Sequence, residues 1–523
     1  MKLFEKHYDK IAAQRANFEA MLAAIDKIKD ENERLTLAEQ AAHYAAYRCT
    51  GYFTSSFLEA FFVEMAKSLK AELGGINFKP NSFLHILTSG DNKGGHTRVV
   101  ERWIENAPKE QIHSVAVLSP FENVALTTLN KNAHEKGGEF IEFKRNLNLK
   151  DRALKLRKLA MGYEFVILHI HMEDPTAVVA FGSKDFTRPV MFYNHASHLF
   201  SLGKSVTDLF LDIIENDETT SVRRGVKDAF FLGVPSKEIR LTRPDKAALR
   251  ERLNLPRDKK IILTSATSAK YRPIDNENMI DLITPLVDES TICYAIGAQP
   301  SEKMWHDAHE QSGGKITALG YVNFDEGYMD YLAAADLYLD SYPMPGGTAM
   351  IDAIAAGTPA LSLRTAFSQF DYLTQTAAYC LDKDEFIKKA KNALNDGEFA
   401  QNLVQETQAS LLKYQSIAAW NEKINRLLQI APKEHRVRDL RGEKDYCEID
   451  DLCVQDSLIY NDKFLTMPTP SIDDIRFGIV YKMVGVAGLI VLEKRQKDRV
   501  RTKSIKAFGH ILFRWHKKMK NEP

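Results

Sequence analysis

The spacing of apolar residues divides the chain into a helical front part and a longer part with short, strand-like runs. Over residues 1–78 apolar positions recur every third or fourth residue and proline is absent, which predicts helices. Phe57, Phe61, Phe62 and Met65 give one of these helices an apolar stripe. We therefore predict a helical N-terminal region over 1–78 that packs on the rest of the protein; a platform for a polypeptide or glycan acceptor is the alternative.

Two later stretches alternate apolar runs of strand length with helical segments. The first covers residues 79–235 and the second 258–400, and the expected strands are 83–87, 115–118, 165–170, 189–193, 260–264, 291–296, 316–322, 337–339 and 360–363. This alternation predicts parallel βαβ units, so each stretch should be a doubly wound α/β domain. Residues 236–257 carry prolines and charges around one charged helix, which is typical of an exposed linker.

The C-terminal part of the chain differs from both α/β stretches. Residues 401–432 read as helices that cross back to the first domain, and 433–474 are charged and irregular. Residues 475–523 combine many lysines and arginines with apolar and aromatic residues at helical spacing. A basic amphipathic tail of this kind favours an anionic membrane surface; a helix that binds a protein partner or a solvated tail are the alternatives.

One stretch carries the strongest functional signal, ADLYLDSYPMPGGTAMIDAIAAGTPALSL, from Ala335 to Leu363. A buried strand runs to Asp340, Gly346 and Gly347 form a loop, and a helix begins at Thr348. A helix start behind glycines has backbone N–H groups and a partial positive charge available to a phosphate. Asp352, one turn further on the same helical face, could reach a ribose hydroxyl. An ordinary α/β turn is the alternative.

This stretch resembles the donor-nucleotide motif of GT-B glycosyltransferases, most closely those of the O-GlcNAc transferase type and the bacterial cytoplasmic protein glycosyltransferases related to them. The shared elements are Asp340, Pro343, the Gly346-Gly347-Thr348 loop, Asp352 and the Gly357-Thr358-Pro359 stop. Ala349 departs from the family, which often has a second threonine there. The two glutamates that many retaining GT-B enzymes carry around this loop are missing, which favours the inverting branch.

The resemblance implies further donor contacts in the second α/β stretch. Lys270 follows the first strand of that stretch, where relatives hold the donor diphosphate with a lysine. A cation is wanted there because glycosyl transfer leaves negative charge on the leaving diphosphate. Tyr321 and Val322 match the place where relatives bind the nucleotide base. GT-B enzymes generally need no metal, so we expect a UDP-sugar as donor substrate and no cofactor or metal.

The first α/β stretch supplies candidates for catalysis, all at the carboxyl ends of strands, where α/β sheets bind ligands. His96, after Gly94-Gly95, is the leading candidate for general base or for orienting the acceptor, and Asp174 is the second. Asn194, His195 and His198 lie in a loop that in relatives faces the donor sugar and diphosphate. His198 is also a catalytic candidate.

A histidine pair also stands in the first α/β stretch. His169 and His171 share one face of a strand, but no third metal ligand is evident. We therefore do not expect a metal there.

Composition narrows the class of protein. The 523 residues balance 70 basic against 70 acidic side chains, which gives no overall bias toward nucleic acid. Five scattered cysteines without metal spacing, a charged start and no long apolar run predict a cytoplasmic protein, which a membrane-binding tail would hold at the inner face of the membrane.

The sequence as a whole thus predicts an inverting, metal-independent glycosyltransferase of GT-B fold. It would move GlcNAc or glucose from a UDP-sugar to a protein or glycan acceptor. A retaining transferase or epimerase on the same fold is one rival. The other is a non-catalytic nucleotide-sugar-binding partner that stabilises another glycosyltransferase.

Overall fold

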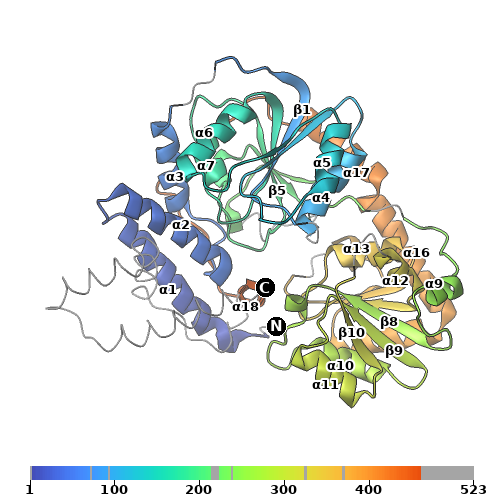
Figure 1. Cartoon of the computed structure of the whole chain (residues 1–523). Coiled ribbons are helices and arrows are strands. Elements are labelled where there is room, and N and C mark those ends of the chain that lie inside the picture. The colour runs from blue at the N-terminus through green and yellow to red at the C-terminus, as the bar shows by residue number, and fades with distance from the viewer. Residues whose placement is uncertain are drawn as a thin grey trace.

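Two parallel β-sheets, each enclosed by helices, form the body of the protein (Figure 1). The computed structural model describes residues 3–70, 74–91, 95–213, 223–236, 239–322, 327–367 and 371–460. Within these residues the first sheet has seven strands in the order β3-β2-β1-β4-β5-β6-β7, and the second has six in the order β10-β9-β8-β11-β12-β13. The predicted pair of doubly wound α/β domains is confirmed. Gly94 and the basic tail at 475–523 lie outside the described residues.

The first sheet uses every strand expected from the sequence and three that the sequence did not predict. Its strands are β1 Lys79–Leu87, β2 Ile112–Val117, β3 Phe140–Glu142, β4 Tyr163–His169, β5 Val190–Asn194, β6 Leu209–Asp212 and β7 Ala229–Phe231. Its helices are α4 Gly95–Asn106, α5 Thr127–Glu135, α6 Leu149–Ala160 and α7 Thr176–Phe181. The additional strands β3, β6 and β7 have four residues or fewer, so they are too short to show a period of two.

The second sheet follows the predicted strands closely. Its strands are β8 Lys260–Ser265, β9 Thr291–Ile296, β10 Ile316–Gly320, β11 Leu337–Leu339, β12 Ala360–Leu363 and the unpredicted β13 Tyr379–Cys380. Its helices are α9 Lys246–Arg252, α10 Met279–Ile283, α11 Lys303–Gln311, α12 Tyr328–Ala334, α13 Thr348–Ala355, α14 Asp371–Thr374, α15 Lys383–Asn395 and α16 Gly397–Gln415. Short 3₁₀ turns lie at Glu5–His7, Lys204–Val206, Ser268–Tyr271 and Thr284–Leu286.

The segment 236–257 is not the exposed linker that its prolines and charges suggested. Its helix α9 packs on α12 of the second domain. Arg250 is buried, and its guanidinium donates to Ala334 O, Lys259 O and the Asp336 carboxylate. Because the charge is paired inside the fold, α9 belongs to the second domain.

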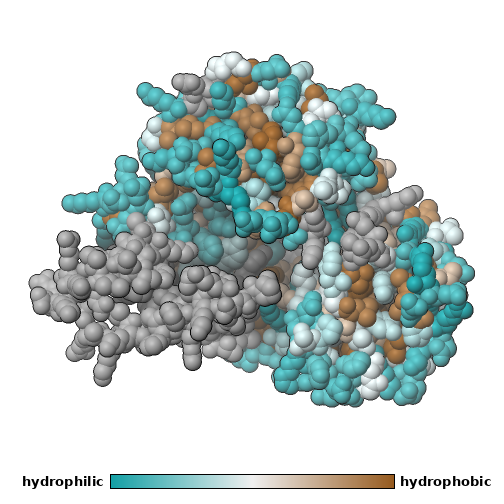
Figure 2. All heavy atoms as spheres, in the orientation of Figure 1, coloured by the Kyte–Doolittle hydropathy of each residue, from teal (hydrophilic) through white to brown (hydrophobic). Residues whose placement is uncertain are grey.

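Helices from both ends of the chain join the domains. The N-terminal helices α1 Tyr8–Ile25, α2 Glu31–Arg48 and α3 Ser56–Ser68 share one apolar core with the first sheet. The late helix α17 Ile417–Ile430 returns to the first domain, where the Trp420 ring packs edge-on against Trp103 at 5.5 Å. In Figure 2 hydrophilic side chains cover most of the visible surface of both domains, with smaller apolar patches among them.

A helix within 433–474 corrects the prediction that this segment is irregular. α18 spans Asp451–Tyr460 and lies between the N-terminal helices and the second domain (Figure 1). The hydrogen bond from Gln455 Nε2 to Pro343 O and the one from Ala366 N to Gln455 Oε1 tie it to the loops of the second sheet. Tertiary contacts therefore give this helix an order that its local sequence does not signal.

Candidate functional site

A cavity of about 1110 Å³ lies between the two domains, and almost every residue that the sequence predicted as a site residue lines it. Its lining includes the following predicted site residues: His96, Asn194, His195, His198, Lys270, Tyr321, Val322, Gly346, Gly347, Thr348 and Asp352. They come from the carboxyl ends of strands in both sheets, so the two ligand-binding edges face one another. Cavities of this size between domains are typical of small-molecule sites.

The glycine loop ends at a helix start that is open to an anion. Gly347 precedes α13 with φ of 67°, a conformation that glycine adopts without strain. The first hydrogen bonds inside α13 run from Met350 N and Ile351 N to Gly347 O. The N–H groups of Thr348 and Ala349 come before these bonds, and they are therefore available to a phosphate.

Gly346 has no room for a side chain. Its N–H donates to Asp340 Oδ1 at 2.7 Å, and a Cβ built on it would lie 2.7 Å from the same oxygen. The Asp340 carboxylate also accepts from Ser341 N and Ser362 Oγ. Asp340 therefore fixes the position of the Gly346-Gly347 loop that precedes the helix start.

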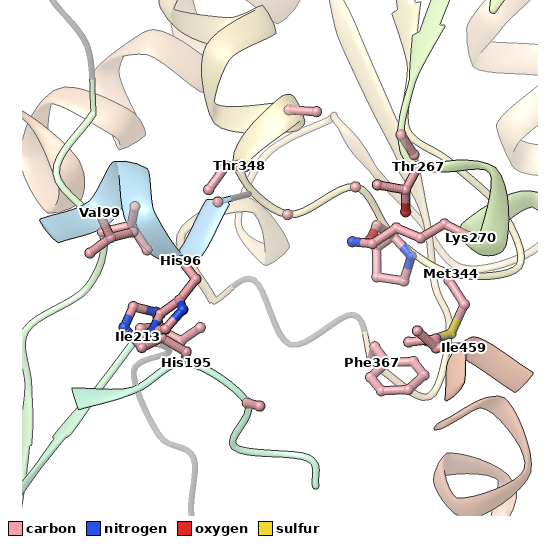
Figure 3. Close-up of a pocket in the computed structure, with 18 of the residues that line it drawn as sticks. His96, Val99, His195, Ile213, Thr267, Lys270, Met344, Thr348, Phe367 and Ile459 are labelled. Atoms are coloured by element: carbon pink, nitrogen blue, oxygen red, sulfur yellow. The ribbon is translucent and has the colours of Figure 1, made fainter. Parts of the chain in front are cut away.

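Lys270 lies opposite this helix start (Figure 3). Its Nζ donates to Pro345 O at 2.6 Å, one residue before the glycines. Burial lowers the pKa of Lys270, and the nearby Asp340 carboxylate opposes that shift. The arrangement brings a lysine and a helix start to one place, which suits the two negative charges of a diphosphate.

Asp340 gives the site a testable pH dependence. Burial raises the pKa of this carboxyl to about 6, against the Gly346 N–H and Lys270, which stabilise its charge. The ionised form is therefore disfavoured in the folded state, so this group's contribution to stability grows as pH falls from about 6 toward the unfolded value of about 4. We compare the free energies of unfolding of Asp340→Asn and wild type, measured by urea denaturation. The value for the variant minus that for wild type should be about 2 kcal/mol higher at pH 7.5 than at pH 4.5. A constant difference across that range would contradict the assignment.

Asp352 joins the two domains in addition to lining the cavity. Its Oδ1 accepts from Arg102 Nη2 of α4 at 3.1 Å, and both side chains are buried. Arg102 also donates through Nη1 to Pro235 O. The sequence pointed to Asp352 as a ribose ligand but did not predict this partner, because only the approach of the two domains brings Arg102 to it. The ribose contact stays a prediction.

Two imidazoles face the donor site from the first domain (Figure 3). The rings of His96 and His195 meet edge to face at 4.2 Å. His96 Nε2 lies 2.7 Å from His169 O, so this nitrogen carries the proton and leaves Nδ1 as an acceptor. Burial, with His171 nearby, lowers the pKa of His96 to about 4, so the ring is neutral at physiological pH. A neutral imidazole is the form that can take a proton.

His198, Asn194 and Tyr321 complete the predicted residues that line the cavity. His198 packs edge-on against Phe367 at 4.8 Å, and burial together with Lys270 and Arg224 lowers its pKa to about 3. Asn194 is buried and donates to Asp212 Oδ1, whereas Tyr321 is 48% exposed at the cavity rim. These side chains can offer hydrogen bonds and a ring surface to a sugar nucleotide.

Asp174 does not line the cavity. Its carboxylate accepts from Thr176 N, Thr176 Oγ1 and Thr88 Oγ1 at the start of α7. The carboxylate of this candidate base is thus engaged in hydrogen bonds at the start of α7, outside the lining of the cavity.

The described residues contain no group of three or more His, Cys, Asp or Glu side chains arranged to hold a metal ion. Within the same part of the chain, no helix is both long and apolar enough to cross a bilayer. The expectations of metal independence and of membrane contact through the tail stay predictions.

No family model and no curated protein sequence matches the chain. Its fold is similar to those of several solved structures. HepE of Anabaena in complex with UDP and glucose is 16% identical and aligns over 66% of this chain and 99% of its own, with a TM-score of 0.53. A glycosyltransferase from Rickettsia africae is 9% identical over 67% of this chain and 98% of its own, with a TM-score of 0.51. These similarities, with the two facing sheets, show that the chain has the GT-B fold.

The branch of GT-B enzymes is not decided by these similarities. The O-GlcNAc transferase of Thermobaculum terrenum aligns over 81% of this chain and 83% of its own at 12% identity, with a TM-score of 0.47. A similarity at that level favours no branch, so the O-GlcNAc transferase type stays a prediction.

Proposed function

We propose that the protein transfers a glycosyl group from a UDP-sugar to a hydroxyl or amide of a protein or glycan acceptor, with inversion at the sugar carbon. The observation that carries the proposal is the meeting of Lys270 with the open start of α13 in a cavity between two Rossmann-like domains. The HepE neighbour was solved with UDP-glucose, which supports a UDP-sugar as the donor.

The chemistry follows from where the charges lie. The acceptor atom, a hydroxyl oxygen or an amide nitrogen, loses its proton to an imidazole on the first-domain side and forms a bond to C1 of the sugar. The electron pair of the bond between C1 and the phosphate oxygen leaves with UDP. Lys270 and the N–H groups at the start of α13 would stabilise the negative charge that develops on this diphosphate. GlcNAc or glucose is the sugar that the family resemblance favours.

Two features of the cavity support the inverting, metal-independent form of the reaction. Asp91 and Asp352 are the carboxylates among its described lining residues, and the Asp352 carboxylate is paired with Arg102, which makes it a poor nucleophile for a double displacement. Lys270 and Arg98 supply positive charge that a metal would otherwise bring. The anomeric configuration of the product, determined by NMR in the presence of EDTA, tests both points; retention or loss of activity would contradict them.

Ligand-induced stabilisation tests the donor assignment. UDP at about 100 times its dissociation constant should stabilise the fold by about 2.7 kcal/mol and raise the melting temperature. Uridine is the matched control, because it keeps the base and ribose but lacks the diphosphate. Equal effects of UDP and uridine would contradict diphosphate binding. UDP binding without donor hydrolysis or transfer would favour the non-catalytic partner instead.

A further inference from the structure

A row of buried histidines crosses the first sheet and ends at the cavity. Its members are His113 on β2, His85 on β1, His169 on β4 and His195 just after β5. In the strand register His113 pairs with Phe83, and His169 pairs with Leu87. The row therefore moves two residues toward the carboxyl ends with each strand, and a step of two keeps every ring on the same face of the sheet.

The rings are joined nitrogen to nitrogen. His113 Nδ1 lies 2.9 Å from His85 Nε2, His85 Nδ1 lies 3.0 Å from His169 Nε2, and His169 Nδ1 lies 2.9 Å from His195 Nε2. At the inner end His113 Nε2 lies 3.2 Å from Gln111 Oε1. His85, His113 and His169 have no exposed surface, and Trp103 covers the row with its ring 5.1 Å from His85.

This geometry gives the row a direction. A carbonyl oxygen can only accept, so His113 Nε2 must carry the proton that it donates to Gln111. His113 Nδ1 is then an acceptor, which requires His85 to donate from Nε2, and the same reasoning passes through His169 to His195. Burial keeps the pKa of each ring below its ordinary value, so the rings are neutral and each has one donor and one acceptor nitrogen.

We propose that Gln111, His113, His85 and His169 hold His195 in the Nε2–H tautomer, so that its Nδ1 takes the proton of the acceptor hydroxyl. This inference rests on the proposed function and assigns the general base within it. His195 lines the cavity, and Nδ1 is the nitrogen that the row itself does not use. The four inner residues are positioning residues, and His96 at 4.2 Å orients the acceptor.

His195 is better placed than His96 to hold the proton. His96 donates its N–H to the backbone carbonyl oxygen of His169. His195 donates its N–H to the imidazole Nδ1 of His169, which is a more basic acceptor than a carbonyl oxygen. In the transfer the acceptor O–H bond breaks, the proton joins Nδ1, and the oxygen bonds to C1 as UDP departs. The imidazolium that forms is stabilised through Nε2–H by the polarised row.

Tautomer-sensitive NMR tests the row without any substrate. Long-range ¹⁵N–¹H correlation on ¹⁵N-histidine-labelled protein should show His195 protonated at Nε2 and bare at Nδ1, with the signals assigned by His195→Phe. Gln111→Met removes the terminal acceptor and should produce a mixture of the two tautomers. Gln401→Met makes the same change on the exposed face of α16 and should leave the spectrum unchanged. A proton on Nδ1 of His195 in the wild-type protein would overturn the proposal.

Donor hydrolysis, with water in the place of the acceptor, tests the assigned base. We expect His195→Phe to lower kcat about a hundredfold or more, since general bases contribute about 10²–10⁴-fold. Gln111→Met should lower kcat roughly tenfold with KM for the UDP-sugar unchanged, because the base is still present but misdirected. A kcat for His195→Phe within about twofold of wild type would overturn the inference while leaving the transferase intact. If the wild-type protein does not bind UDP, the proposed function itself is overturned.

Discussion

Replacing Lys270 by alanine is expected to weaken UDP binding roughly 10- to 100-fold, the loss of about 1.5–3 kcal/mol that a hydrogen bond to a charged group contributes. The reason is local: Lys270 Nζ lies beside the Pro345-Gly346 turn, where it faces the start of α13. Isothermal titration calorimetry with UDP measures the change directly. Uridine binding should fall much less, because the lysine addresses the diphosphate.

The matched control for Lys270→Ala is Lys303→Ala in the same domain. Lys303 stands on α11 with 88% of its side chain exposed, so its removal changes the domain's charge equally without touching the cavity. We expect UDP affinity to stay within about twofold of wild type for this variant, since exposed pairs contribute little. Unchanged affinity in Lys270→Ala would remove the lysine from the donor site.

The second large effect concerns stability. Asp352→Ala should destabilise the protein by about 3 kcal/mol, because it leaves the buried Arg102 guanidinium with only Pro235 O as a partner. Replacing both charges by apolar residues, Arg102→Met with Asp352→Leu, should recover most of that loss, since no charge is then buried alone. Urea denaturation of Arg102→Met, of Asp352→Leu and of the double variant forms the cycle.

Asp439→Ala is the control for this cycle. Asp439 pairs with Arg441 at the surface, where 60% and 66% of the two side chains are exposed. Its loss should cost much less than that of Asp352, because solvent screens an exposed pair. If Asp352→Ala costs no more than this surface variant, the Arg102–Asp352 pair does not hold the domains together.

Local sequence was sufficient for the donor half of the site. The strand, glycine loop, helix and second strand between Ala335 and Leu363 appear as β11, α13 and β12 with nearly the expected ends. Each boundary there has its own chemical signal, such as Gly347 before the helix and Pro359 after it. Lys270 needed the family resemblance, because a single lysine in a loop has no distinctive local pattern.

Features created by long-range pairing could not be predicted in the same way. The histidine row joins His113, His85, His169 and His195 through strand register and order, which a single sequence does not reveal. The Arg102 partner of Asp352 lies 250 residues earlier in the chain. The helix α18 was missed because its packing partners, not its own periodicity, hold it in place.

Donor binding as proposed requires that a diphosphate lies between the start of α13 and Lys270. A crystal structure of the protein with UDP would show whether it does. We predict phosphate oxygens within hydrogen-bond distance of Lys270 Nζ and of the backbone N–H groups of Thr348 and Ala349, with uracil near Tyr321 and Val322. UDP bound elsewhere, with the Gly346-Gly347 loop empty, would contradict the account.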